Sequence, residues 1–272
     1  MSSSPTIGVF DSGFGGLTVL SALLRRIPHA SYAFLGDSAR LPYGSKSRRT
    51  IARYAAESAR FLVREQGAEY LVIACNTASA LALDAIQDAV PVPVLGVIEP
   101  GAANARAASK TGDVLVIATA ATVQSHAYAA ACETQGLRAL EKACPLLVPL
   151  VEEGWTNHPV TAEVIRIYLD ELAREADKAG LRPDALVLGC THYPLLRSLL
   201  ERAVPAGMRV IDSAEATAEA AVQLFGLNGA ENKPATAQIR CFATDSVEKF
   251  ERLGSRFLGR PVGKVELVDL GG

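Results

Sequence analysis

The sequence predicts an α/β protein made of two pseudo-symmetric lobes, each a doubly wound parallel sheet, with the active site in the cleft between the lobes. Two observations carry this prediction. Short apolar runs alternate with longer helical patterns along the chain, and the pattern of the first half recurs in the second. In sheets of this kind, ligands bind beyond the carboxyl ends of the strands, so chemistry is expected where strands end.

Seven segments are predicted to be buried strands, because each is a continuous apolar run bounded by turn residues, as in parallel sheets covered on both faces. In chain order they are TIGVF, YAFLGD, YLVIA, VPVLGV, DVLVIAT, DALVLG and MRVID. Between them lie segments rich in Ala, Leu and Arg at helical spacing, such as SRRTIARYAAESARFLVREQG, which closes at Gly67. This alternation of strand and helix is typical of doubly wound architecture.

The chain also repeats itself. IGVFDSGFGGLTVLSALL resembles VLVIATAATVQSHAYAA, and LVIACNT is matched by LVLGCTH. The repeat predicts a first lobe of residues 1–97 plus 212–272 and a second lobe of residues 98–211. The last segment holds the strands QIRCFA and VELVDL and is expected to pack on the first lobe. Any two strand–helix units resemble each other to some extent, so the evidence for a repeat comes mainly from the matching cysteines that end LVIAC and LVLGC.

Composition excludes several classes of protein. The 272 residues include 27 basic and 29 acidic ones, without a basic stripe, so no nucleic-acid partner is expected. No apolar run reaches the roughly 18 residues of a membrane span, and the first residues lack the pattern of a signal peptide. Five cysteines, an odd number, favour reduced thiols in a cytoplasmic protein.

Cys75 lies where a predicted strand ends and a helix begins. Asn76 or Thr77 is expected to cap that helix, whose N-terminus favours an anion such as a thiolate or a substrate carboxylate. Taken alone, the cysteine is as well explained by packing, since free Cys is among the most buried residue types.

Cys190 changes this balance because it has the same setting in the second lobe, followed by Thr191 and His192. Three interpretations of the pair remain open. A disulfide is disfavoured by the compartment, and a metal site with His192 has few ligands and no CxxC motif. The third is a pair of acid–base groups on opposite faces of one carbon, where a thiol and a thiolate exchange roles. The chain has no GxGxxG after its first strand and no Walker A motif, so no cofactor is expected.

Three further loops hold candidate residues. DSGFGGLTVL offers Asp11 and Ser12 beside glycines that permit close backbone approach. In GDSARLPYGSKS, Pro42 and Gly44 shape a turn that presents Tyr43 and backbone amides. CPLLVPLVEEGW ends in two carboxylates, of which one is expected to enter the cleft.

Together these motifs resemble the glutamate racemases of the aspartate/glutamate racemase superfamily. FDSGFGGLTV, GDSARLPYG, ACNTASA, GVIEPG, VIATAATVQSHAY, CPLLVPLVEEGW, LGCTHYPLL and IDSAEATA occur in that order. The resemblance implies a cofactor-independent isomerase that interconverts L- and D-glutamate and supplies D-glutamate for peptidoglycan, and hence for cell wall biogenesis and cell shape. It implies two catalytic cysteines, Cys75 and Cys190.

The resemblance also implies that Asp11 assists Cys75, and that Glu152 and His192 assist Cys190, with Glu153 as the alternative to Glu152. The substrate contacts that it implies are Asp11, Ser12, Pro42, Tyr43, Gly44, Asn76, Thr77, Thr119, Thr191 and His192. The resemblance implies no metal and no cofactor. It does imply a homodimer. Aspartate racemase and a two-lobed amino-acid-binding protein are the alternatives, while nothing in the residues supports a partner among DNA-handling enzymes.

Overall fold

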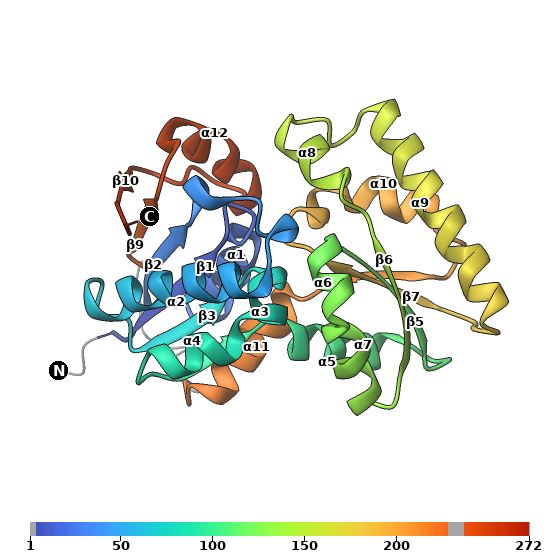
Figure 1. Cartoon of the computed structure of the whole chain (residues 1–272), viewed down its shortest axis with the longest axis horizontal. Helices are drawn as coiled ribbons and strands as arrows, with labels where there is room; N and C mark the ends of the chain where they lie inside the picture. The colour runs from blue at the N-terminus through green and yellow to red at the C-terminus, as the bar shows by residue number, and fades with distance from the viewer. Residues whose placement is uncertain (1–3, 228–236, 272) are drawn as a thin grey trace. The chain divides into compact units, whose positions relative to one another are not determined.

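The computed structural model describes residues 4–227 and 237–271, and it confirms the predicted α/β class with parallel sheets in two lobes (Figure 1). One compact unit comprises the residues up to Val97 and from Ala214 onward, and the other comprises Ile98–Ser213. We call them unit 1 and unit 2.

Within its described residues, unit 1 is built on six parallel strands in the order β10-β9-β2-β1-β3-β4. The strands are β1 (Thr6–Asp11), β2 (Ser31–Gly36), β3 (Tyr70–Ile73), β4 (Val94–Gly96), β9 (Ile239–Ala243) and β10 (Val265–Leu267). The helices are α1 (Leu17–Arg26), η1 (Ser38–Arg40), η2 (Tyr43–Ser45), α2 (Arg48–Arg64), α3 (Asn76–Leu81), α4 (Leu83–Ala89), α11 (Ala214–Leu224) and α12 (Val247–Leu258). Strands from the C-terminal segment thus extend the first sheet.

The core of unit 1 follows from the alternation of side chains along each strand. On one face, Phe10 and Leu35 join a buried cluster with α2, α3 and α4. On the other face, the ring of Phe34 lies 5.9 Å from that of Phe250 on α12. Both faces are covered (Figure 1), which is why these strands are apolar throughout. The carboxyl ends of the strands remain the place where polar residues gather.

Unit 2 is built on four parallel strands in the order β6-β5-β7-β8. They are β5 (Asp113–Ala118), β6 (Arg138–Ala143), β7 (Ala185–Gly189) and β8 (Arg209–Asp212). Its helices are α5 (Ile98–Ala108), α6 (Ala120–Ser125), α7 (Ala127–Thr134), α8 (Leu147–Glu152), α9 (Pro159–Lys178), η3 (Tyr193–Leu196) and α10 (Arg197–Ala203). Helices α5 and α7 pack together, as do α9 and α10.

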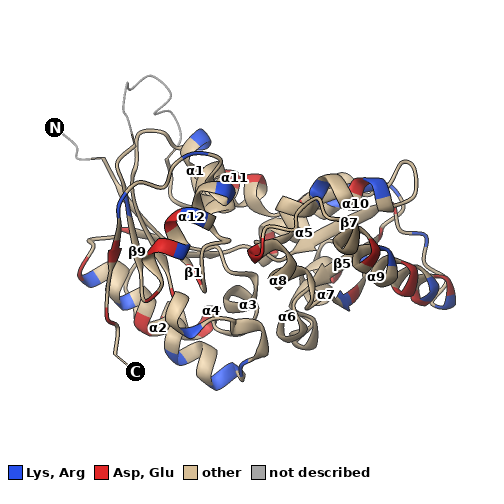
Figure 2. Cartoon of the chain, turned by 90° about the horizontal axis from the view of Figure 1, so that it is seen from above, with Lys and Arg blue, Asp and Glu red and all other residues tan. Residues whose placement is uncertain are grey.

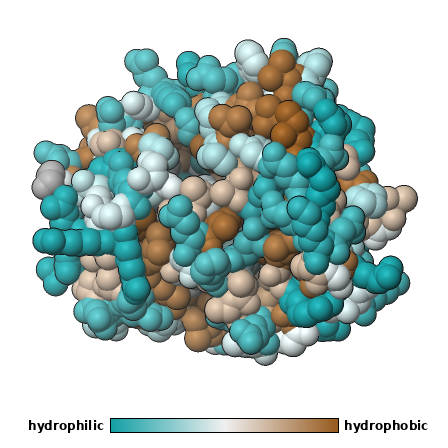
Figure 3. Space-filling model, turned by 45° about the vertical axis from the view of Figure 1, so that its right-hand side comes forward, coloured by the Kyte–Doolittle hydropathy of each residue, from teal (hydrophilic) through white to brown (hydrophobic). Residues whose placement is uncertain are grey.

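Basic and acidic residues follow one another along α9 (Figure 2). Arg166 bridges Glu163 and Asp170 at helical spacing, which gives modest support to a solvated helix. The face of the molecule in Figure 3 is mostly hydrophilic, with hydrophobic atoms gathered in a few places. No helix of the described residues has the length and apolar character that crossing a bilayer requires.

Candidate active site

The first group of predicted site residues lies at the carboxyl ends of β1 and β3, which are neighbours in the sheet. Phe10 pairs with Ile73, and the Ala74 amide donates to the Phe10 carbonyl. This register places Asp11 and Cys75 side by side just beyond the strands. Asp11 is almost fully buried, and its Oδ2 accepts from the Gly13 amide at 3.0 Å.

Cys75 is the N-cap of α3, and its sulfur accepts from the Ala78 amide at 3.4 Å. The expected cap was Asn76 or Thr77, but both lie inside the first turn of the helix. The sulfur also donates to Ser12 Oγ at 3.3 Å. Burial, followed by the negative charge of Asp11, raises the pKa of Cys75 to about 12. The thiol form of Cys75 therefore predominates in the resting protein at neutral pH.

The loop after β2 reaches the same edge. Pro42 follows a cis peptide bond, and Tyr43 begins the short helix η2. The ring of Tyr43 is 1% exposed, and its hydroxyl donates to Asp37 Oδ2 at 2.6 Å. The side chain of Tyr43 thus faces the core, whereas Pro42 and Gly44 keep exposed surface. A substrate contact by this loop would come from Pro42, Gly44 or the backbone.

Unit 2 contains a second group in the matching place. Ala118 pairs with Gly189, so Thr119 and Cys190 follow adjacent strand ends. Thr119 Oγ1 lies 2.9 Å from Thr122 Oγ1. Cys190 is 5% exposed, as is Cys75, and Thr191 is also buried. Unlike Cys75, Cys190 is followed by a 3₁₀ helix, η3, so the two groups differ in detail.

His192 connects Cys190 to a carboxylate. Its Nδ1 lies 3.9 Å from Cys190 Sγ, and its Nε2 lies 3.2 Å from Glu152 Oε1. Burial by itself lowers the pKa of His192, but the contacts with Cys190 and Glu152 outweigh it and raise the pKa to about 10. Glu152 ends α8 and turns toward His192, while Glu153 is exposed. The geometry selects Glu152, not Glu153, for this contact.

The structure brings the predicted residues together in two groups, one in each unit. Asp11, Ser12, Cys75, Asn76 and Thr77 share the edge of the first sheet, and Thr119, Glu152, Cys190, Thr191 and His192 share that of the second. All five cysteines are free thiols. Among the described residues, no cluster of three or more His, Cys, Asp or Glu suits a metal ion.

Two polar residues beside the first group were not predicted. Asp37 follows β2 and is fully buried, and Thr244 follows β9 and donates to Asp37 Oδ1 at 2.9 Å. Asp37 could have been found from the sequence, because the dipeptide Gly36–Asp37 lies at the end of a predicted strand. Nothing near Thr244 in the sequence indicates that it returns to this loop.

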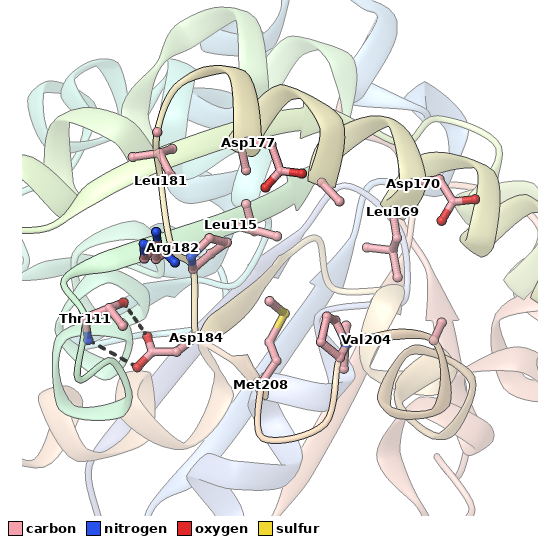
Figure 4. Close-up of a pocket in the computed structure, with 16 residues that line it drawn as sticks. Thr111, Leu115, Leu169, Asp170, Asp177, Leu181, Arg182, Asp184, Val204 and Met208 are labelled. Atoms are coloured by element: carbon pink, nitrogen blue, oxygen red, sulfur yellow. Dashed lines mark hydrogen bonds between the residues drawn. The ribbon is translucent and has the colours of Figure 1, made fainter.

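A pocket of about 740 Å³ lies elsewhere in unit 2, at the opposite ends of the strands (Figure 4). Its lining comes from α9 and from the loops that precede β5, β7 and β8, and it includes none of the predicted site residues. Asp184 at its edge accepts from the Thr111 amide at 3.2 Å and from Ser109 Oγ at 2.6 Å. This carboxylate thus stabilises the loop before β5.

Comparison with known proteins finds relatives over nearly the whole chain. The family described as Asp/Glu/Hydantoin racemase matches residues 17–221. A protein named glutamate racemase from Koribacter versatilis is 54% identical over 98% of both chains. A crystal structure of a glutamate racemase isoform from Bacillus anthracis superposes with a TM-score of 0.90 at 36% identity, covering 99% of both chains. A glutamate racemase from Francisella tularensis in complex with D-glutamate gives 0.87 at 35% identity, with the same coverage.

Proposed function

The chain belongs to the Asp/Glu/Hydantoin racemase family and is an amino-acid racemase, an isomerase; from this premise we propose that it interconverts L- and D-glutamate without a cofactor. The names of its relatives support glutamate as the substrate, and the two matching cysteine groups support the chemistry. The strongest single observation is that each unit ends one strand on a buried thiol with its own acid–base neighbour.

The proposed reaction is a two-base proton transfer. One cysteine, as thiolate, takes the proton from Cα and becomes a thiol. The other cysteine, as thiol, gives its proton to the opposite face of the same carbon and becomes a thiolate. No electrons are exchanged, and the reverse reaction uses the same groups with their roles exchanged. The mechanism requires both sulfur atoms to reach one Cα.

The surroundings of Cys75 bear on its protonation. Because burial and the negative charge of Asp11 raise its pKa to about 12, the thiol form of Cys75 is favoured before substrate binds. The enantiomer that binds then decides which cysteine takes the Cα proton and which gives one, and His192, which contacts both Cys190 and Glu152, is proposed to assist the second thiol. After transfer, the thiolate of Cys75 lies beside Ser12 and the Ala78 amide, both of which stabilise a negative sulfur by hydrogen bonding.

The remaining predicted residues are proposed to hold the substrate. Cα beside a carboxylate is a very weak acid, so the developing negative charge needs N–H and O–H donors in a site that excludes water. Hydroxyls, an amide and strand-end backbone groups supply such donors from Ser12, Gly44, Asn76, Thr77, Thr119 and Thr191. The carboxylate of Asp11, buried at the end of β1, is proposed to pair with the substrate ammonium.

The test is incubation with L-glutamate in heavy water. We expect D-glutamate that carries deuterium at Cα. Parallel incubations with L-aspartate distinguish an aspartate racemase. Tight binding of glutamate without exchange of the Cα hydrogen would identify an amino-acid-binding protein instead. Recovery of unlabelled, unchanged L-glutamate would refute the proposal.

The cellular role follows as part of the same proposal. A cytoplasmic enzyme of this kind supplies D-glutamate for peptidoglycan, and expression in a bacterium that requires D-glutamate should remove the requirement. We also propose a homodimer, which light scattering on purified protein measures directly.

A further inference from the structure

Asp37 is a fully buried carboxylate whose oxygens accept hydrogen bonds from Tyr43 in the same loop and from Thr244 in a distant segment of the chain. Tyr43 Oη donates to its Oδ2 at 2.6 Å, and Thr244 Oγ1 donates to its Oδ1 at 2.9 Å. Arg40 adds a positive charge, with Nη1 3.8 Å from Oδ2. Burying a carboxylate costs free energy unless its oxygens accept hydrogen bonds. These hydrogen bonds therefore hold Tyr43 and Thr244 in position as well as Asp37.

Thr244 makes further contacts with the same loop. Its Oγ1 accepts from the Ala39 amide at 2.9 Å, and its own amide donates to the Gly36 carbonyl at 3.2 Å. The neighbouring Asp245 exchanges two hydrogen bonds with Ser38, one through its amide and one through its carbonyl. The C-terminal segment after β9 therefore braces the loop that begins at Asp37.

The other end of this hydrogen-bond chain, Tyr43, belongs to the same buried cluster as the reacting thiol. The ring of Tyr43 packs on Phe10, with centroids 6.1 Å apart, and belongs to the buried cluster that includes Cys75. Helix η2, which starts at Tyr43, contacts α3, whose N-cap is Cys75. A shift of Tyr43 would therefore move both Cys75 and the backbone of Pro42 and Gly44.

We propose that Thr244 is a positioning residue of the racemase site, which acts through Asp37 to hold Tyr43 and thereby the loop of residues 42–44 and Cys75. The proposal rests on the proposed function, because residues 42–44 and Cys75 matter as parts of that site. Thr244 touches no reacting atom. Its hydroxyl both donates to Asp37 and accepts from Ala39, so removing it takes one donor away from the buried carboxylate of Asp37, which costs free energy, and one acceptor away from the exposed amide of Ala39.

The test compares Thr244→Val with Thr244→Ser. Valine keeps the shape of threonine without its hydroxyl, while serine restores the hydroxyl. We expect Thr244→Val to raise KM for glutamate about tenfold, the effect of losing one hydrogen bond to a charged group, and Thr244→Ser to return KM close to wild type. Thr217→Val is the matched control. This buried threonine of α11 has a hydroxyl without a hydrogen-bond partner among the described residues, so KM should not change.

A double variant tests the route. If Thr244 acts through Asp37 and Tyr43, Tyr43→Phe also raises KM, and adding Thr244→Val to it has little further effect. The proposal would be overturned if the KM increases of the two single variants multiplied in the double variant. It would equally be overturned if KM were unchanged in Thr244→Val, or if Thr244→Ser had the same KM as Thr244→Val. Should Thr244→Val fail to fold, Tyr43→Phe tests the chain from its other end, and an unchanged KM there overturns it equally.

An independent measurement separates this proposal from the proposed function. The rate at which iodoacetamide alkylates Cys75, followed by mass spectrometry, reports its position whether or not glutamate is the substrate. We expect the rate to change several-fold in Thr244→Val but not in Thr244→Ser or Thr217→Val. If the wild-type protein does not racemise glutamate, the proposed function fails. If it does but the alkylation rates are equal, the role of Thr244 fails.

Discussion

His192 and Glu152 form a largely buried pair in unit 2, with Nε2 and Oε1 3.2 Å apart. The pair links a helix end to the residue two positions after Cys190, so it ties α8 to the strand end that carries the thiol. It also makes the charge of His192 part of the stability of the folded protein.

The stability of unit 2 should depend on pH through this pair. The pKa of His192 is raised in the folded protein from its ordinary 6.5 to about 10, because the contacts with Cys190 and Glu152 outweigh burial. Its contribution is therefore complete below pH 6.5 and is lost as the pH rises toward 10. We expect the difference in unfolding free energy between wild type and His192→Gln to shrink over that range in urea titrations. A difference that grows with pH would contradict this.

Asp11→Asn should change activity and thiol reactivity in opposite directions. The carboxylate of Asp11, after burial, raises the pKa of Cys75. Removing its charge should therefore speed alkylation of Cys75 at pH 8, while racemisation slows because the group proposed to assist Cys75 is lost. Peptide-level mass spectrometry gives the first quantity and a polarimetric assay gives the second. Cys132, in unit 2, serves as the internal control. Slower alkylation of Cys75 would show that Asp11 does not act on this thiol.

Gly16 is required for the position of Asp11. A Cβ at Gly16 would lie 2.6 Å from Asp11 Cβ and 2.8 Å from Ala74 Cβ, too close for either to remain in place. Because a displacement of about 1 Å in a catalytic group can cost up to about 100-fold in rate, Gly16→Ala should reduce kcat roughly 10- to 100-fold.

Gly67→Ala is the matched control for this variant. Gly67 has a φ of 70°, and a Cβ added there would meet no atom within 4 Å. Its substitution should cost about 1 kcal/mol of stability through backbone strain without changing kcat. Equal kcat values for the two variants would count against the role assigned to Gly16.

Two buried threonines should respond oppositely to valine. Thr217 buries a hydroxyl without a hydrogen-bond partner among the described residues, whereas Thr161 donates to the Trp155 carbonyl at 2.7 Å. An unsatisfied buried hydroxyl costs free energy, so Thr217→Val should stabilise the protein by about 1 kcal/mol, and Thr161→Val should destabilise it by about the same amount. Chemical denaturation measures both, and destabilisation by Thr217→Val would contradict the prediction.

Much of the fold was predictable because strands buried in a parallel sheet appear in the sequence as continuous apolar runs. Strand β6, Arg138–Ala143, was missed because it lies at the edge of its sheet and is half exposed, with charged residues in place of an apolar run. The internal repeat contained the missing information. The four strands of the second sheet, β6-β5-β7-β8, follow the same order as β2-β1-β3-β4 in the first sheet. Strand β6 therefore occupies the place in unit 2 that β2 occupies in unit 1.

The residues of the candidate site were predictable to the extent that they lie at strand ends within one unit. Cys75 and Cys190 end strands in the sequence, and so each was found with its neighbours. The inward turn of Tyr43 and the return of Thr244 to Asp37 were not predictable, because they depend on packing between segments that are far apart in the chain. The N-cap of α3 is Cys75, not Asn76 or Thr77. The residue at which the helix begins depends on backbone geometry, which the preference of Asn and Thr for N-cap positions does not reveal.

The central claim is that two thiols serve opposite faces of one carbon. Its most direct test incubates Cys75→Ala and Cys190→Ala separately with pure L- and pure D-glutamate in heavy water, and follows both optical purity and deuterium at Cα. We predict that neither variant racemises either enantiomer, and that any exchange at Cα affects opposite enantiomers in the two variants. Racemisation by either variant, or exchange of the same enantiomer by both, would contradict the two-base mechanism.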